Sequence, residues 1–168
     1  MITNNYSNRL FGRTRGKSKK KIDLKKYYQT VDKYKFQNFD KKINYILDIG
    51  TGYGETSIFL ANQFLDKVII SCEKYIDGNI ILLKNIEKNK IKNILLHNGN
   101  VYDVLECIHR ECFDLVWIFF PDPWPKNRHA KRRLITSDFL KKLHNTLKEN
   151  SEIHIATDST IYVRFILN

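Results

Sequence analysis

The fold class of this chain is decided by the stretch LDIGTGYGE, residues 47–55. A short apolar run, which continues back to Ile46, leads into glycines at alternate positions, Gly50, Gly52 and Gly54. Glycines permit a tight turn, and they let a ligand approach the backbone where a following helix begins. The pattern is typical of the first strand, loop and helix of an α/β domain that binds a ligand at this loop.

Short apolar runs recur along the rest of the chain and alternate with helical patterns. Such runs are typical of strands that are covered on both faces. They predict strands at 46–49, 68–72, 94–96, 115–120 and 153–156, and helices at about 56–65, 76–90, 101–111 and 137–148. This alternation predicts an α/β fold with a doubly wound, mostly parallel sheet, in which ligands bind beyond the carboxyl ends of the strands.

Polar side chains follow the predicted strands. Glu73 stands about 20 residues beyond the glycines, where an acid can accept hydrogen bonds from both ribose hydroxyls of a nucleoside, unless it only pairs with Lys74. Asn100 could present its amide to an adenine edge or be an ordinary turn asparagine, and Asp103 is near enough to take its place. Because Glu55 replaces the third glycine of a dinucleotide site and would repel a pyrophosphate, the pattern favours a cofactor without phosphate, such as S-adenosylmethionine.

The stretch FFPDPWPKNRHAKRR, residues 119–133, joins the fourth predicted strand to a basic run. Pro121 and Pro123 fix φ and withhold backbone donors, so the chain must leave the sheet abruptly and hold Asp122 at the carboxyl end of the strand. Residues 126–133 carry five basic side chains and no carboxylate, which favours a nearby polyanion over a solvated basic surface. An acid beside such a patch predicts chemistry on a nucleic acid.

The positive charge of the chain is concentrated in two places. The formal net charge is +11 at pH 7, and residues 1–42 hold 13 basic against three acidic side chains. We therefore expect a basic N-terminal arm at 1–42, with a solvated lysine-rich surface as the alternative, and one domain at 43–168. Six arginines fall in the arm and in the basic run, where guanidinium groups suit phosphate contacts: Arg9, Arg13, Arg15, Arg128, Arg132 and Arg133.

Length and composition exclude several classes of protein. A chain of 168 residues fits one domain with a real core. No apolar stretch approaches the roughly 20 residues that span a bilayer, and the polar start lacks a secretory core, so we expect a soluble, cytoplasmic protein without a membrane partner. Three cysteines without a C-x-x-C pair and five scattered histidines predict neither a disulfide framework nor a metal site.

The motifs PDPWPK, RHAKRR and ATD resemble those of the bacterial-type tRNA (guanine-N(7)-)-methyltransferases, and the resemblance covers roughly residues 8–168. It implies a Rossmann-like class I methyltransferase that transfers the methyl group of S-adenosylmethionine to ring nitrogen 7 of a guanosine in tRNA. Asp122 is the implied active-site carboxylate. The implied cofactor contacts are Asp48, Gly50, Gly52, Gly54, Glu73, Asn100 and Asp122, and the implied tRNA contacts are Lys126, Arg128, His129, Lys131, Arg132, Arg133 and Asp158.

Three further expectations accompany this resemblance. The segment FGRTRGK, residues 11–17, resembles the basic leader of the family and is expected to fold on tRNA. Trp124 could stack on a base or pack under its loop. His129, which stands within the basic run, is expected to contact RNA or solvent rather than to take part in catalysis.

The chain departs from the family pattern at two positions and at its end. The family often has Glu at position 48 and Asp at position 100, and both exchanges keep a hydrogen-bond acceptor. Family members continue well beyond the ATD strand, whereas this chain stops at Asn168. We therefore expect a sheet without its last strands. The chain is then a fragment, or a partner chain supplies the C-terminal completing segment, or the product is degraded by mutation.

Two other functions remain open at this point. One is another S-adenosylmethionine-dependent nucleic-acid methyltransferase that acts on an exocyclic amine. Such enzymes tend to have an N/D-P-P-Y/F turn at the fourth strand, and the PDPW turn of this chain disfavours that function. The other is a non-catalytic RNA-binding remnant, which would bind tRNA in a salt-sensitive way without affinity for the cofactor.

Overall fold

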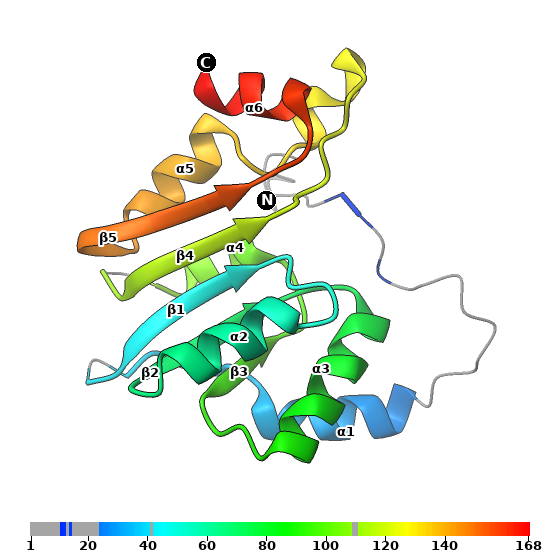
Figure 1. Ribbon diagram of the computed structural model, residues 1–168, viewed down its shortest axis with the longest axis vertical. Helices are drawn as coiled ribbons and strands as arrows, with labels where there is room; N and C mark the ends of the chain where they lie inside the picture. The colour runs from blue at the N-terminus through cyan, green and yellow to red at the C-terminus, as the bar shows by residue number, and fades with distance from the viewer. Residues whose placement is uncertain (1–10, 13, 15–23, 41, 109–110) are drawn as a thin grey trace, which may run out of the picture.

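The computed structural model describes residues 11–12, 14, 24–40, 42–108 and 111–168, and it contains a five-stranded sheet with helices on both faces (Figure 1). All of the strand pairs are parallel. The strands lie in the order β3-β2-β1-β4-β5 and comprise β1 (Asn44–Ile49), β2 (Lys67–Cys72), β3 (Ile94–His97), β4 (Phe113–Phe119) and β5 (Leu147–Ala156). The doubly wound parallel sheet predicted from the sequence is thus confirmed.

The helices separate into two groups, one on each face of the sheet. They are α1 (Leu24–Tyr34), α2 (Glu55–Gln63), α3 (Ile76–Asn89), α4 (Val101–Glu106), α5 (Ser137–His144) and α6 (Thr160–Leu167), with a 3₁₀ helix, η2, at Asn127–Arg132. Buried side chains of α1, α2 and α3 form one core cluster with the sheet, and those of α4, α5 and α6 form another. None of the described helices is long and apolar enough to cross a membrane.

The alternation of side chains along each strand explains why two cores form. Ile46 of β1 packs in the cluster with α1, α2 and α3, whereas the next residue, Leu47, packs in the cluster with α4, α5 and α6. Successive side chains of a strand point to opposite faces, so a strand that is covered on both faces must be apolar at nearly every position. This requirement produces the short apolar runs from which the strands were predicted.

Two predicted helices are shorter in the structure than expected, and the one predicted at 101–111 ends at Glu106. The helix predicted at 137–148 ends at His144, and β5 begins at Leu147 rather than near 153. The hydroxyl of Thr146 donates a hydrogen bond of 2.7 Å to the carbonyl of Leu143, which closes the last turn of the helix. Leu147 has helical spacing from the preceding leucines, but it pairs with Phe113 of β4 instead.

Residues 24–40, which were expected in a basic arm, are packed against the domain. Tyr27 and Val31 of α1 are 4% and 1% exposed and belong to the core cluster on that face of the sheet. Phe36 is buried, and its backbone N–H donates to the carbonyl of Leu96 in β3 at 2.8 Å. The lysines of this segment hide the four-residue spacing of Tyr27 and Val31, which is the signature of an amphipathic helix. The three arginines expected in the arm lie outside the described residues.

The packing of α1 can be tested with a core substitution. We expect Val31→Ala to lower the free energy of unfolding by about 2 kcal/mol, because it removes buried methyl groups and leaves a cavity. The exposed Gln29→Ala on the same helix should change it by less than about 0.5 kcal/mol. Urea unfolding followed by circular dichroism measures both values. Equal midpoints for the two variants would show that α1 is not part of the folded core.

Candidate active site

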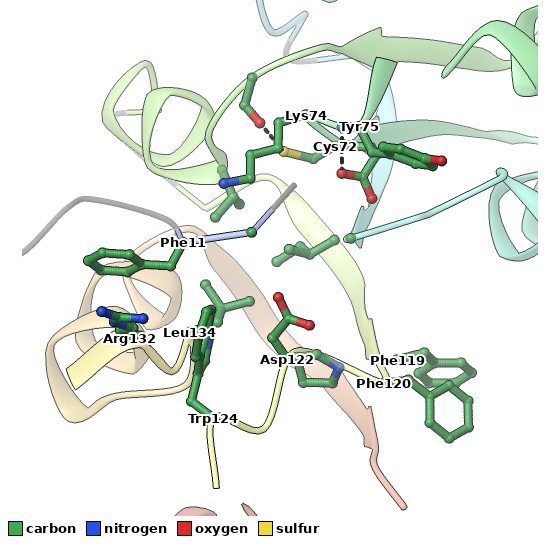
Figure 2. Close-up of a pocket in the computed structure, with 17 residues that line it drawn as sticks. Phe11, Cys72, Lys74, Tyr75, Phe119, Phe120, Asp122, Trp124, Arg132 and Leu134 are labelled. Atoms are coloured by element: carbon green, nitrogen blue, oxygen red, sulfur yellow. Dashed lines mark hydrogen bonds between the residues drawn. The ribbon is translucent and has the colours of Figure 1, made fainter. Parts of the chain in front are cut away.

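The carboxyl ends of β1, β2 and β4 border a pocket of about 250 Å³ (Figure 2). The strand order reverses between β1 and β4, so the chain leaves these two strands toward opposite faces and a crevice remains at their ends. The pocket walls include Ile49, Gly50, Glu73, Gly99, Phe120 and Asp122. The pocket therefore lies where the sequence predicted a ligand. No group of His, Cys, Asp or Glu side chains that could hold a metal ion occurs among the residues that the structure describes.

The glycine loop after β1 combines close packing with open space. Gly54 precedes α2 with a φ of +83°, and an added Cβ there would lie 2.6 Å from the Cδ1 atom of Leu82 in α3. A side chain at Gly54 would thus be strained and would collide with the core. At Gly50 and Gly52, in contrast, no heavy atom beyond the adjacent residues lies within 4 Å of the position that a Cβ would take. Since Gly50 lines the pocket, a ligand can approach the backbone at this point.

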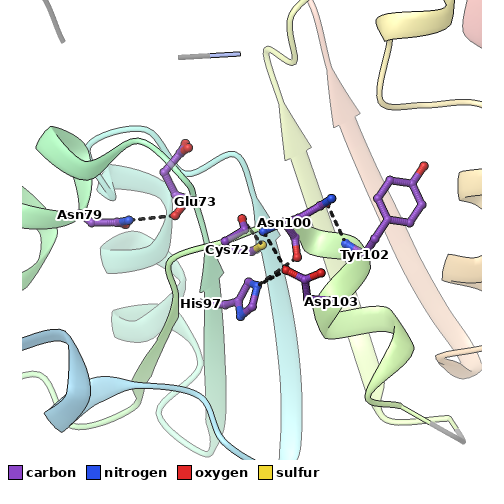
Figure 3. Close-up of polar contacts among 8 residues, drawn as sticks. Cys72, Glu73, Asn79, His97, Asn100, Tyr102 and Asp103 are labelled. Atoms are coloured by element: carbon purple, nitrogen blue, oxygen red, sulfur yellow. Dashed lines mark hydrogen bonds and ion pairs between the residues drawn. The ribbon is translucent and has the colours of Figure 1, made fainter. Parts of the chain in front are cut away.

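Glu73 follows β2, and backbone donors hold its carboxylate in place. Its Oε2 atom accepts a hydrogen bond of 2.9 Å from the N–H of Gly52, and its Oε1 atom accepts one of 2.9 Å from the N–H of Tyr75. The amide of Asn79 donates to the main-chain carbonyl of Glu73 at 2.8 Å (Figure 3). The carboxylate is therefore fixed between the glycine loop and the start of α3. Each of its oxygens retains capacity for a further hydrogen bond.

Asp48 does not line the pocket, although it was expected to contact a cofactor. It is 1% exposed, and its Oδ2 atom accepts hydrogen bonds from the hydroxyls of Thr56 at 2.6 Å and of Ser57 at 2.7 Å. Burial raises the pKa of Asp48 to about 6, and the two hydroxyl donors oppose this shift. In this structure Asp48 ties the end of β1 to the first turn of α2.

Asn100 occupies the N-terminus of α4 rather than the pocket wall. Its Oδ1 atom accepts from the N–H of Tyr102 at 3.1 Å, and the carboxylate of Asp103 accepts from the N–H of Asn100 at 3.3 Å (Figure 3). This reciprocal pair is a capping box, which satisfies backbone donors at the helix start. Its neighbours Gly99 and Val101 line the pocket. Asn100 and Asp103, which were alternatives for the same cofactor contact, thus together cap the N-terminus of α4.

Asp122 lies in a strained loop at the end of β4. It is exposed and lines the pocket (Figure 2). Asp122 follows β4 and Glu73 follows β2, and these two strands lie on either side of β1. Phe120 and Trp124, which flank Asp122, have φ angles of +49° and +42°, in a region that costs non-glycine residues about 1–2 kcal/mol each. The N–H of Phe120 donates to the carbonyl of Ala156 in β5 at 2.8 Å. The backbone of this loop is therefore fixed in a conformation that turns Asp122 toward the pocket.

The expected tRNA contacts differ in their exposure. On and beside η2, the exposed side chains are those of Lys126, Arg128 and Lys131, whereas His129 is half-buried. Asp158 is also exposed. Asp158 follows β5 and does not line the pocket. Partial desolvation, followed by the positive charges of Arg132 and other basic neighbours, lowers the pKa of His129. At neutral pH His129 is therefore a weaker contact for phosphate than the lysines and arginines beside it.

The two adjacent arginines of the basic run point to different environments. The guanidinium carbon of Arg132 lies 4.9 Å from the ring centroid of Trp124 and 5.2 Å from that of Phe11, at the rim of the pocket (Figure 2). Arg133 is 7% exposed and donates hydrogen bonds to the carbonyls of Pro123 and Trp124. The expected contact between Arg133 and RNA is not available in this structure, because its guanidinium group is buried beneath the Asp122 loop.

Some pocket residues were not predicted from the sequence. Phe11 and Gly12 come from the expected N-terminal arm and lie beside the Asp122 loop, where the Phe11 ring meets the Trp124 ring edge-on at 6.4 Å between centroids. Trp124 packs within this aromatic group and lines the pocket. In the sequence, Phe11 is an aromatic residue within a basic segment. This was the available signal that the segment contacts the pocket.

Comparison with known proteins places the chain in a family. Residues 42–168 match the family model described as "Putative methyltransferase". The chain is 34% identical over 161 residues to a protein of Neorickettsia sennetsu named tRNA (guanine-N(7)-)-methyltransferase, an alignment that covers 94% of this chain and 72% of that protein. The chain belongs to this family of tRNA (guanine-N(7)-)-methyltransferases. The family member from Nitrosomonas eutropha is 45% identical over 114 residues, which are 67% of this chain and 51% of that protein.

The chain spans about half the length of several family members, including 52% of the protein from Zymomonas mobilis. Solved structures agree on the fold at low sequence identity. A precorrin-6y C5,15-methyltransferase from Geobacter metallireducens has a TM-score of 0.59 and 17% identity, over 90% of this chain and 72% of that one. A SAM-dependent O-methyltransferase from Thermotoga maritima has a TM-score of 0.56 and 16% identity, over 90% and 50%. These likenesses confirm the Rossmann-like methyltransferase fold of this family member.

The buried position of Asp48 predicts a pH dependence of stability. Its pKa lies near 6 in the folded protein, above the ordinary value of 3.8, so the folded state binds the proton more tightly than the unfolded chain does. The stabilisation is complete below about pH 4 and is lost as the pH rises through about 6. Relative to Asp48→Asn, the native protein should lose on the order of 2 kcal/mol across this range. Urea unfolding of both proteins from pH 4 to 7 measures the difference. A difference that does not vary with pH would contradict the prediction.

Proposed function

We propose that this chain transfers the methyl group of S-adenosylmethionine to ring nitrogen 7 of a guanosine in tRNA. The observation that carries the proposal is a pocket at the switch point of the sheet, with Glu73 on one side and Asp122 on the other, next to an exposed basic segment. The names of the family members agree with it. A tRNA substrate would be met in the cytoplasm.

The residues of the pocket fit S-adenosylmethionine. The carboxylate of Glu73 is held by two backbone donors and can accept the ribose hydroxyls. The apolar side chains of Ile49 and Val101 suit the adenine ring, and the open space at Gly50 lets the ligand approach the backbone. The bound cofactor supplies an electrophilic methyl group on a positively charged sulfur. Two carboxylates in the pocket wall complement that charge.

The proposed reaction needs little acid–base chemistry from the protein. Ring nitrogen 7 of guanine has an unprotonated lone pair, so no general base has to remove a proton before it attacks. Orientation of the two reactants can supply several kcal/mol of the barrier, on the order of 7 in favourable cases. We assign Asp122 to this task, because it lies on the pocket wall on a loop of fixed backbone. Its carboxylate holds the guanine edge and stabilises the positive charge that develops on the purine.

The exposed basic side chains provide the surface for the RNA backbone. Lys126, Arg128 and Lys131 are exposed on and beside η2, which directly follows the Asp122 loop. A phosphate backbone bound there would place an adjoining base near the pocket. Arg132, at the pocket rim, and Asp158, after β5, complete the proposed substrate surface. We assign His129 a minor part because its pKa is lowered.

The role of Asp122 is tested by Asp122→Ala, with Asp122→Asn as the matched isosteric variant. Loss of the carboxylate should reduce methyl transfer to an unmodified tRNA transcript about 100-fold or more, because charge stabilisation at a reacting centre is of this size. Labelled S-adenosylmethionine measures the rate, and mass spectrometry locates the methyl group. Transfer at the native rate by either variant would contradict the assignment.

A substrate control separates this reaction from its rivals. A transcript with 7-deazaguanosine lacks the attacking nitrogen and should accept no methyl group, whereas an enzyme that acts on an exocyclic amine would still methylate it. Saturable binding of tRNA without measurable affinity for S-adenosylmethionine would instead show a non-catalytic RNA-binding protein.

The phosphate surface predicts salt-dependent binding. The affinity for tRNA should fall steeply with salt, and Lys131→Met should reduce the slope of log Kd against log salt by about 0.7–0.9, the value expected for one lost phosphate contact. Fluorescence anisotropy of labelled tRNA over a range of potassium chloride concentrations measures the slope. Binding that does not respond to salt would remove the basis for the phosphate surface.

A further inference from the structure

We propose that Arg133 is a positioning residue for Asp122, which braces the backbone of the Asp122 loop from beneath, and that it is not a contact to RNA phosphate. The inference rests on the proposed function, since it assigns a residue that supports the same site. It separates Arg133 from the basic side chains that precede it in the sequence. The geometry of the guanidinium group, its burial and the strain of the loop each support it.

The guanidinium group joins two consecutive carbonyls of the loop. The Nε atom donates to the carbonyl of Pro123 at 2.9 Å, and the Nη2 atom donates to the carbonyl of Trp124 at 3.2 Å. A planar fork with several fixed donors can hold two acceptors at a set separation, which a lysine ammonium cannot reproduce. Because the two carbonyls directly follow Asp122, the brace acts on the backbone that sets the direction of its side chain.

The charged group is enclosed by protein. Arg133 is 7% exposed, and its guanidinium carbon lies 4.4 Å from the ring centroid of Phe165 and 5.7 Å from that of Tyr162. Tyr162 is itself fixed in the core, where its hydroxyl accepts from the N–H of Ile135 at 3.0 Å. A charge can be buried when carbonyl acceptors and aromatic faces replace water. Reaching a phosphate would require Arg133 to give up all of these contacts.

The Asp122 loop needs hydrogen bonds from outside, because it can form few hydrogen bonds within itself. Pro121 and Pro123 have no N–H groups, so they cannot donate hydrogen bonds within the loop. Phe120 and Trp124 have left-handed backbone conformations, which persist only where surrounding contacts fix them. The donors of Arg133 reach the carbonyl side of this segment, and the link from Phe120 to β5 fixes its other end. Asp122 stands between the two anchors.

The experiment compares Arg133→Met and Arg133→Lys with Lys131→Met in the full chain. Lys131 lies two residues earlier and is exposed, so its variant is the matched control for a phosphate contact. Arg133→Lys keeps the charge and loses the fork, and it serves as the conservative variant if Arg133→Met does not fold. Three quantities are measured for each protein: the salt slope of tRNA binding, kcat and KM for tRNA, and the fluorescence of Trp124 with Trp117 replaced by Phe.

For both Arg133 variants we expect an unchanged salt slope, a KM for tRNA within about threefold of native, a kcat reduced about 100-fold, and a shifted Trp124 emission. A displacement of the reacting groups by about 1 Å is enough for such a loss of rate. Lys131→Met should instead weaken binding and reduce the salt slope by about 0.7–0.9.

Two results would overturn the proposal. A salt slope that falls in Arg133→Lys or Arg133→Met as it does in Lys131→Met would identify Arg133 as a phosphate contact. A native kcat together with native Trp124 emission in a folded Arg133 variant would show that the loop needs no brace. If the native chain transfers no methyl group, the proposed function fails, whereas the salt slope and the Trp124 emission still decide whether Arg133 braces the loop.

Discussion

The pairing of β1 with β2 on one side and with β4 on the other is the constraint on which the site depends. In this register Ile49, the last residue of β1, lies beside Cys72 of β2 and Ile118 of β4, so three strands end at one edge of the sheet. The residues that follow these ends, Gly50, Glu73 and Asp122, come together although they are far apart in the sequence. Any one-residue slip in this register would move a strand end and reverse the faces of its side chains. A slip of β1 would also break the buried hydrogen bonds of Asp48 with Thr56 and Ser57, which opposes it.

Three carboxylates near this edge have different environments and therefore different tasks. Asp48 is buried with two hydroxyl donors, and burial raises its pKa to about 6. Glu73 accepts two backbone N–H groups, which fix its direction while it still faces the pocket. Asp122 is exposed and lines the pocket from the loop after β4. A buried carboxylate suits a structural link, a fixed one suits recognition, and an exposed one suits a substrate that must enter and leave.

The sequence was sufficient for the strands, apart from the early start of β5, and for the position of the pocket, because both follow from local rules. Continuous apolar runs mark strands that are buried on both faces, and glycines and prolines mark where they end. The boundary of the basic arm could not be placed in the same way. The lysines around Tyr27 and Val31 dominate the composition of this segment, whereas the burial of Tyr27 and Val31 depends on packing against β3 and α3, which only the fold creates.

The roles of residues at the site were harder to predict, because the type of a residue does not determine where its side chain points. Asp48 shares a face of β1 with Ile46, so strand alternation directs it toward α2 and away from the pocket edge. Arg132 and Arg133 are equivalent as charges in a motif, and only the path of η2 sends one to the pocket rim and the other into the core. A resemblance to a family motif identifies a segment whose residues contribute to one site. It does not separate side chains that touch the substrate from side chains that hold the segment.

The strained residues of the Asp122 loop show why this separation matters. Glycine at positions 120 and 124 would relieve a strain of about 1–2 kcal/mol each, yet the chain has aromatic residues there. Trp124 packs against Phe11 and Arg132, and Phe120 is 66% exposed at the pocket wall, so both side chains shape the rim. Two hydrogen bonds from a charged donor contribute about 1.5–3 kcal/mol each, which is of the same size as the strain. The hydrogen bonds of Arg133 thus offset the strain at residues 120–124, where the chain turns sharply and still carries the aromatic side chains of Phe120 and Trp124.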